Sequence, residues 1–273
     1  MTESASPVPS SGHPPPTGDS APATPVLLLP LLVAVSTVVA AGLLTVTGHA
    51  SADLLAVAVA LAGAVLSWGW PGTLSVPSPR GSTAVLLLGT AALVLTVALE
   101  SEPPYLELLP VAMAGGVLAC FVHQLARRAG RPRLVESIAS TVTGLAVIAS
   151  GACTIALPHL EDGPWLLTAG MAAVAVSAVT DLLGRWPALL VWSLPIGMVL
   201  GAAAAVAVGQ AGGVDWPPAL VLGVAGAGVS HAVRRVLSVL PTLAGARPQL
   251  VSGTASVLLT GVLVVVVQRA FAG

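Results

Sequence analysis

The sequence has no lysine, one tyrosine and two phenylalanines. Charged residues make up 8% of its 273 residues, whereas a soluble domain carries about a quarter. The ten basic residues are all arginine, and none of their clusters is interleaved with aromatic side chains. Nucleic-acid binding needs a basic patch, and single strands are bound by stacking on aromatic rings. The composition therefore argues against a nucleic-acid partner.

Long apolar runs fill most of the chain instead. Apolar residues make up 56% of the sequence, and runs of the roughly 20 residues needed to cross a bilayer recur after residue 25. The Pro- and Ser-rich residues 1–25 predict a disordered tail, and residues 26–46 predict the first transmembrane helix. Hydropathy predicts eight further spans at residues 54–69, 82–99, 107–124, 134–157, 165–184, 187–209, 217–234 and 249–268. The predicted fold is an all-α integral membrane protein with about nine transmembrane helices.

The arginines are distributed unevenly between the predicted loops. Nine of the ten fall in loops on the side of the N-terminal tail, and the exception is Arg269 near the C-terminus. Acidic residues dominate the opposite loops. Because positively charged loops stay in the cytoplasm, we expect a plasma-membrane protein with a cytoplasmic N-terminus and an outer C-terminus. A basic set made only of arginine is also typical of GC-rich, actinobacterial coding.

Two segments of the chain are nearly identical. Residues 131–140 read RPRLVESIAS and residues 247–256 read RPQLVSGTAS, and the same offset relates Trp70-Pro71 to Trp186-Pro187. These matches predict two four-helix repeats, at residues 54–157 and 170–273, preceded by one extra helix. An even number of spans in each repeat predicts parallel halves that are related by an axis along the membrane normal.

Small residues recur at helical spacing in the second predicted repeat. The seventh span carries Gly197, Gly201 and Gly209 on one face, and the eighth carries Gly223. Small residues let membrane helices approach closely. We therefore predict a close-packed face at these glycines, and we expect it to join the two repeats.

Four ionisable side chains lie near the cytoplasmic ends of predicted spans. They are His123, Glu136, Asp181 and His231. One interpretation is a proton or cation site, because ionisable groups in spans are often functional. The other is local pairing at the hydrated interface, since Arg185 follows Asp181 by one turn and Arg133 precedes Glu136. We favour local pairing, because no ionisable residue falls near the middle of a predicted span, where ion-coupled transporters usually carry one.

Hydroxyl groups are the deepest polar side chains that the sequence predicts. They are Ser140 and Thr141 in the fifth span, and Ser256 and Thr260 in the ninth. They could line a path for a neutral molecule, but such hydroxyls more often bond their own helix or a neighbouring one. We favour the second interpretation.

Catalytic and metal-binding motifs are missing from the sequence. It contains no HExxH, CxxC, P-loop or GxSxG pattern, and its two cysteines, Cys120 and Cys153, are predicted to lie toward opposite faces of the membrane. We therefore expect no enzyme activity, cofactor, metal or disulfide. The predicted function is a non-enzymatic scaffold that contacts membrane lipids and proteins of the cell envelope or division machinery. The alternative is a transporter or lipid-handling permease for a small neutral or amphipathic substrate.

Overall fold

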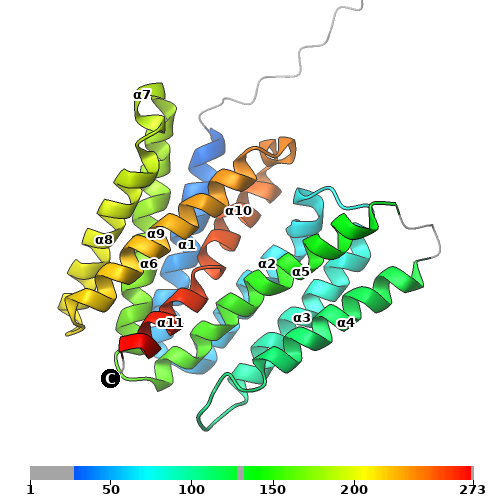
Figure 1. The fold of residues 1–273 in the computed structure, drawn as a ribbon, viewed down its shortest axis with the longest axis horizontal. Helices are drawn as coiled ribbons and strands as arrows, with labels where there is room; N and C mark the ends of the chain where they lie inside the picture. The colour runs from blue at the N-terminus through cyan, green and yellow to red at the C-terminus, as the bar shows by residue number, and fades with distance from the viewer. Residues whose placement is uncertain (1–27, 128–131, 272–273) are drawn as a thin grey trace, which may run out of the picture.

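The described part of the chain consists of helices joined by short turns and loops, and it contains no strand. The computed structural model describes residues 28–127 and 132–271, so the predicted tail at residues 1–25 lies outside the described residues. Eleven α-helices occur in this part (Figure 1): α1 Leu28–Ala50, α2 Ala52–Thr73, α3 Pro79–Ala98, α4 Leu109–Ala126, α5 Leu134–Cys153, α6 Gly163–Thr180, α7 Pro187–Leu190, α8 Ser193–Ala211, α9 Trp216–Ser238, α10 Ala246–Leu258 and α11 Gly261–Phe271. Three 3-10 helices join them: η1 Thr154–His159, η2 Asp181–Arg185 and η3 Pro241–Ala244.

Nine helical segments of the described residues are long and apolar enough to cross a membrane. Their mean hydropathy lies between 1.3 and 2.4, and the ninth, Ala246–Phe271, combines α10 and α11. These helices confirm the predicted all-α fold and the predicted number of helices that are long and apolar enough to cross a membrane. Nine apolar helices of this length suggest a membrane-embedded, multi-pass protein.

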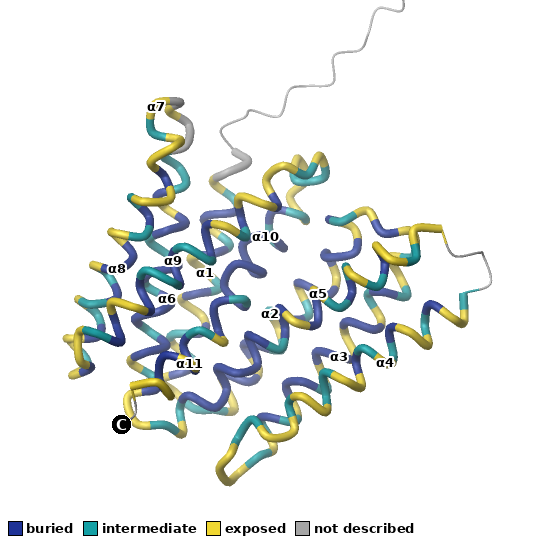
Figure 2. The backbone as a smooth tube through the Cα atoms, viewed as in Figure 1, coloured by how far each residue is buried: buried dark blue, intermediate teal, exposed yellow. Residues whose placement is uncertain are grey.

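The helices form two groups joined by a central set. Helices α2 to α5 pack together, α6 packs with α8 and α9, and α1 and α10 contact both groups (Figure 1). Burial follows this arrangement, because 72% of the ninth span is buried and only 17% of the fourth, α4, whose surface is largely exposed in Figure 2. The ninth span therefore lies at the centre of the bundle.

The seventh span begins later than the sequence predicts. Pro187 begins the four-residue α7, and the long helix α8 begins only at Ser193, with Pro195 in its first turn. Proline lacks a backbone N–H and fits the first turn of a helix. Because two prolines lie eight residues apart, the chain starts a helix twice, and hydropathy merged the two starts into one.

The ninth span is broken near its middle. Helix α10 ends at Leu258 and α11 begins at Gly261. The Ser150 hydroxyl of α5 donates a hydrogen bond to the Leu259 carbonyl at 2.8 Å and accepts one from the Val262 amide at 3.0 Å. Backbone groups at membrane depth need partners inside the protein. Ser150 therefore supplies the hydrogen bonds that the interrupted helix has lost.

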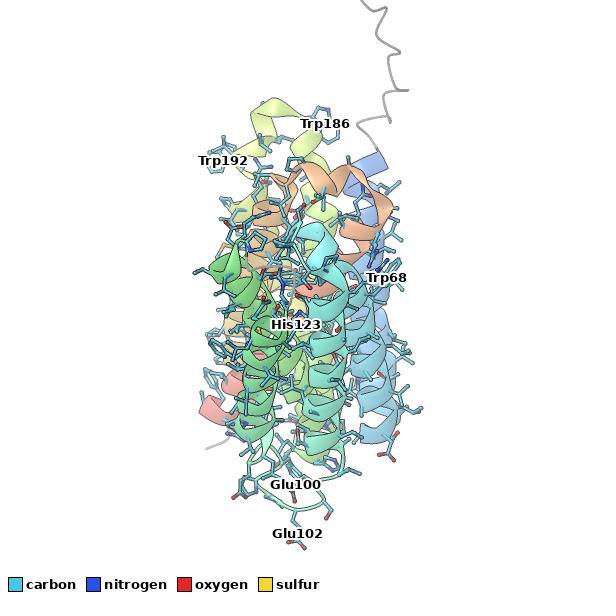
Figure 3. All side chains as sticks on the ribbon, turned by 90° about the vertical axis from the view of Figure 1, so that its right-hand side faces the viewer. Trp68, Glu100, Glu102, His123, Trp186 and Trp192 are labelled. Atoms are coloured by element: carbon cyan, nitrogen blue, oxygen red, sulfur yellow. The ribbon has the colours of Figure 1, made fainter. Side chains whose placement is uncertain are left out.

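The two matched tryptophans have different surroundings. Trp70 is a core residue that is 5% exposed, and its indole N–H donates to the Ser140 carbonyl of α5 at 2.9 Å. Its counterpart Trp186 is 46% exposed. Figure 3 shows Trp186 and Trp192 at one end of the bundle and Glu100 and Glu102 at the other.

The glycines of α8 and α9 lie at a close helix crossing. A Cβ added to Gly201 would lie 2.6 Å from the Ala227 Cβ, and one added to Gly223 would lie 2.6 Å from the Ala202 Cα. The other two neighbours of Gly201 are the carbonyl oxygens of Ala173 in α6 and Gly223 in α9, both at 3.3 Å. All these residues belong to the second half of the chain. The expectation that this face joins the two halves is therefore wrong, because the face closes the packing of α6, α8 and α9.

Candidate functional site

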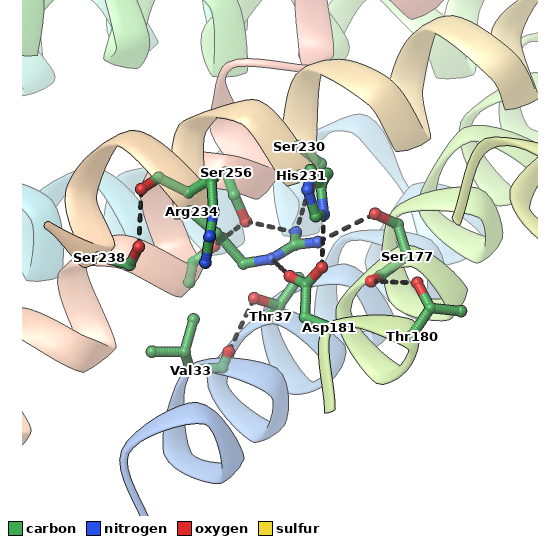
Figure 4. A network of polar contacts seen from close by, with 12 residues as sticks. Val33, Thr37, Ser177, Thr180, Asp181, Ser230, His231, Arg234, Ser238 and Ser256 are labelled. Atoms are coloured by element: carbon green, nitrogen blue, oxygen red, sulfur yellow. Dashed lines mark hydrogen bonds and ion pairs between the residues drawn. The ribbon is translucent and has the colours of Figure 1, made fainter. Parts of the chain in front are cut away.

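A charged cluster lies between α6 and α9 (Figure 4). The Asp181 Oδ1 atom is 2.5 Å from His231 Nδ1, and the Arg234 Nε–H donates to Asp181 Oδ2 at 2.6 Å. Both carboxylate oxygens therefore contact α9. The local pairing with Arg185 that the sequence suggests does not account for these contacts, and the Arg185 side chain lies outside the described residues.

Three serine hydroxyls surround the Arg234 guanidinium. Its Nη2 donates to Ser177 Oγ at 2.9 Å, and its Nη1 donates to Ser230 Oγ and, at 3.3 Å, to Ser256 Oγ. Together with Asp181, these hydroxyls engage four of the five N–H donors of a guanidinium. Arg234 is only 4% exposed. A buried cation of this kind is tolerated because it is both paired with a carboxylate and hydrogen-bonded.

The local sequence of each helix explains why these groups meet. Ser177 and Asp181 are four residues apart, as are Ser230 and Arg234, so each pair lies on one helix face. The Ser177 hydroxyl donates to the Ala227 carbonyl of α9 at 3.0 Å. Because position 227 is alanine, α6 can come close enough to make this bond. The small-residue face and the charged cluster are thus consecutive parts of one helix contact.

The guanidinium of Arg234 reaches the middle of the ninth span. Its partner Ser256 lies ten residues after Ala246, which is about 15 Å along the helix and about half of the 30 Å hydrocarbon thickness. Sequence position places Arg234 one turn from the end of α9, but α9 crosses α10 obliquely (Figure 1) and the arginine side chain extends toward α10.

His231 is the third ionisable member of the cluster. His231 is 8% exposed, and its Nδ1 contacts Asp181. Its Nε2 makes no hydrogen bond with any side chain or backbone group in the described part of the chain. This nitrogen is therefore available to a partner that the described residues do not supply.

The other two ionisable candidates lie in the first half of the chain and have different surroundings. Glu136 forms an exposed ion pair with Arg133, as the local-pairing interpretation predicts. The His123 ring packs over Gly81, and its Nε2 lies 3.4 Å from the Ser78 hydroxyl. The described carboxylates form no ion pair with His123. Of the four candidates, the structure brings together only Asp181 and His231.

The deep hydroxyls mostly bond their own helices. Thr141 donates to the Ser137 carbonyl at 2.9 Å, Thr260 to Val257 at 2.7 Å, and Ser256 to Gly253 at 2.8 Å. Ser256 differs from the others because it also accepts from Arg234. Sequence reasoning therefore identified Ser256 as a candidate but missed Arg234. The available signal was the spacing of Ser230 and Arg234 on one face of α9.

In the part of the chain that the structure describes, the fold and the cluster define an all-α arrangement with nine long apolar helices and a buried Asp–His–Arg site. Within residues 28–127 and 132–271, no group of three or more His, Cys, Asp or Glu side chains is placed to hold a metal ion. Cys120 and Cys153 are both buried and free. Comparisons with protein-family models, with curated proteins and with solved structures find no match.

Proposed function

We propose that the protein is a multi-pass transporter or permease of the cell membrane whose Asp181–His231–Arg234 cluster binds a proton during the transport of a small neutral or amphipathic substrate. The observation that carries this proposal is the buried cluster itself. Ionisable groups inside a membrane bundle are costly and usually mark a transport or relay site. His231 can gain a proton without breaking the Asp181–Arg234 pair, because its Nε2 is unpartnered among the described residues.

The broken ninth span supports the same proposal. Transporters commonly bind their substrates where a membrane helix is discontinuous. Ser256, which contacts Arg234, lies one turn before the break at Leu259 and Thr260. Protonation of His231 would add a positive charge beside Asp181 and so weaken the attraction between Asp181 and Arg234. Arg234 also contacts Ser256, so a shift of its guanidinium would alter the end of α10. The cluster and the break can therefore act as one two-state element.

Cysteine labelling tests this proposal without knowledge of the substrate. In a background with Cys120→Ala and Cys153→Ala, Thr260→Cys is labelled with a membrane-impermeant maleimide from each face of the vesicles. Because the reactivity of any thiol rises with pH, the measured quantity is the ratio of the labelling rates from the two faces at each pH. We expect this ratio to differ between about pH 6 and about pH 8, on either side of the histidine range. His231→Gln should abolish the difference, and the matched variant His123→Gln should keep it. An equal ratio at both pH values in the parent would contradict the proposal.

The scaffold hypothesis is the second proposal. Its support is the short connection between described spans, such as the single residue Ser51 between α1 and α2. Without an extramembrane domain in the described part, a scaffold would contact its partners mainly within the membrane. Crosslinking and pull-down from native membranes, beside imaging of a fluorescent fusion, test this hypothesis. Septal foci with recurrent envelope partners would support it, and a uniform signal without partners would not.

We also propose that the chain contains two four-helix repeats after α1. The support is the order of the elements, because α2, α3, α4 and α5 correspond in sequence to α6, α8, α9 and the ninth span. The packing of the two groups differs. Helix α3 contacts α2, α4 and α5, whereas the corresponding α8 contacts α6 and α9 and makes no comparable contact with α10 or α11. The proposed repeats would thus share an element order and differ in how their last helix is placed.

The proposed orientation places the N-terminus in the cytoplasm and the C-terminus outside. The arginine distribution supports it, and nine spans are an odd number, which puts the termini on opposite sides. We expect reporter fusions at residue 20 and at residue 273 to report opposite sides of the plasma membrane. A same-side result would mean that one of the nine helices does not cross.

A further inference from the structure

An apolar groove runs along the outer surface between α8 and α9, away from the charged cluster. Its volume is about 850 Å³, and its lining includes Pro195, Met198, Val206, Ala207, Leu220 and Val224. This volume is within the range of about 300–1,000 Å³ that is typical of ligand sites. Pro195 to Ala207 covers about 18 Å of helix, which is slightly more than the roughly 15 Å depth of one leaflet. The groove thus has the length of a single acyl chain.

An unpaired arginine lies on the same helix face as the groove. Val224, Gly228 and Arg235 of α9 are separated by four and seven residues, which are close to whole helical turns. Gly228 borders the groove, because a Cβ added there would lie 3.7 Å from Met198. Arg235 is exposed, and none of the ion pairs between described residues includes it. Arg235 therefore places a positive charge on the groove-facing side of α9, about 10 Å beyond Gly228 along the helix, toward the end that we propose to be cytoplasmic.

Charge favours an anionic phospholipid over a second copy of the chain as the occupant of the groove. In a parallel pair of copies, a twofold axis along the membrane normal would bring both Arg235 side chains to the same depth, and the like charges would repel each other. A phospholipid phosphate at that depth would be attracted instead, and basic sites between membrane helices on the cytoplasmic side bind anionic headgroups. Trp192, which is 61% exposed directly before α8, is an aromatic residue of the kind found at headgroup level.

We propose that the groove between α8 and α9 binds one anionic phospholipid, with an acyl chain along Pro195 to Ala207 and the phosphate at Arg235. This site is independent of the proposed proton site, since none of its lining residues belongs to the charged cluster. The lipid would hold α8 and α9 together from the outside, opposite the small-residue face that packs them on α6.

Native mass spectrometry of the full-length protein in mixed micelles of phosphatidylglycerol and phosphatidylcholine tests this site. We expect one retained phosphatidylglycerol in the parent. Arg235→Gln should weaken its binding by about fivefold relative to phosphatidylcholine, as expected for one basic residue. Arg80→Gln is the matched control, because Arg80 is an exposed arginine at the same proposed end of the bundle, and it should leave the binding unchanged.

A second variant fills the groove without touching the charge. Ala203 is an exposed lining residue, so Ala203→Phe should remove the retained lipid while the protein stays folded. Ala91→Phe, at an exposed alanine of α3, should retain it. Parent-like lipid retention in Ala203→Phe would overturn the proposal. A loss of dimers in Ala203→Phe, without any change in lipid retention, would overturn it too and would assign the groove to a second copy.

Discussion

Gly201→Leu is expected to lower the free energy of unfolding by about 3 kcal/mol, the upper end of the range for overpacked sites. The new side chain would begin 2.6 Å from the Ala227 Cβ and 3.3 Å from the carbonyl oxygens of Ala173 and Gly223. Two of these three neighbours are backbone atoms of α6 and α9, which cannot rotate away as a flexible side chain could. The variant can be accommodated only if α8 separates from both helices.

Reversible unfolding in mixed detergent micelles measures this effect. Leu200→Ala is the matched control on the same helix, because Leu200 is 46% exposed and faces away from the crossing. It should change the unfolding free energy much less than Gly201→Leu does. If Gly201→Leu unfolds like the parent, α8 does not pack on α6 and α9 as described.

The number of long apolar helices and their approximate positions could be predicted from the sequence because they depend mainly on hydropathy. A run of about 20 apolar residues satisfies its own backbone hydrogen bonds only as a helix in a bilayer. The spacing of Gly197, Gly201 and Gly209 likewise predicts a close crossing. It does not identify the partner helix, because any small-residue face of a neighbouring helix could satisfy it.

The features that the sequence did not reveal depend on contacts between distant segments. The break after Leu258 has no proline to mark it, and it is stabilised by Ser150, which lies more than a hundred residues earlier. The contact between Arg234 and Ser256 depends on the angle between α9 and α10. Both features involve the ninth span, which is the most buried span among the described helices. Local sequence rules fail where tertiary contacts supply the missing partner.

The charged cluster also predicts unequal costs for removing its two charges. Asp181→Ala should lower the free energy of unfolding by about 3 kcal/mol, since breaking a buried ion pair and leaving one charge unpaired costs about 3–5 kcal/mol. This substitution leaves the Arg234 guanidinium without a carboxylate partner, and the Arg234 side chain is only 3% exposed. Arg234→Met should cost less, because the Asp181 side chain is 21% exposed and keeps its contact with His231. Unfolding in mixed micelles gives both values.

The double variant Asp181→Ala/Arg234→Met should recover most of the stability that Asp181→Ala loses, because replacing a whole buried pair is far less costly than breaking it. Strictly additive losses would mean that the two side chains are not energetically coupled. In the labelling assay at Thr260→Cys, the ratio of the rates from the two faces should still show no dependence on pH in the recovered protein, since His231 has lost its carboxylate. Stability would then be restored without the response to protons, which separates the structural contribution of the ion pair from its proposed role in transport.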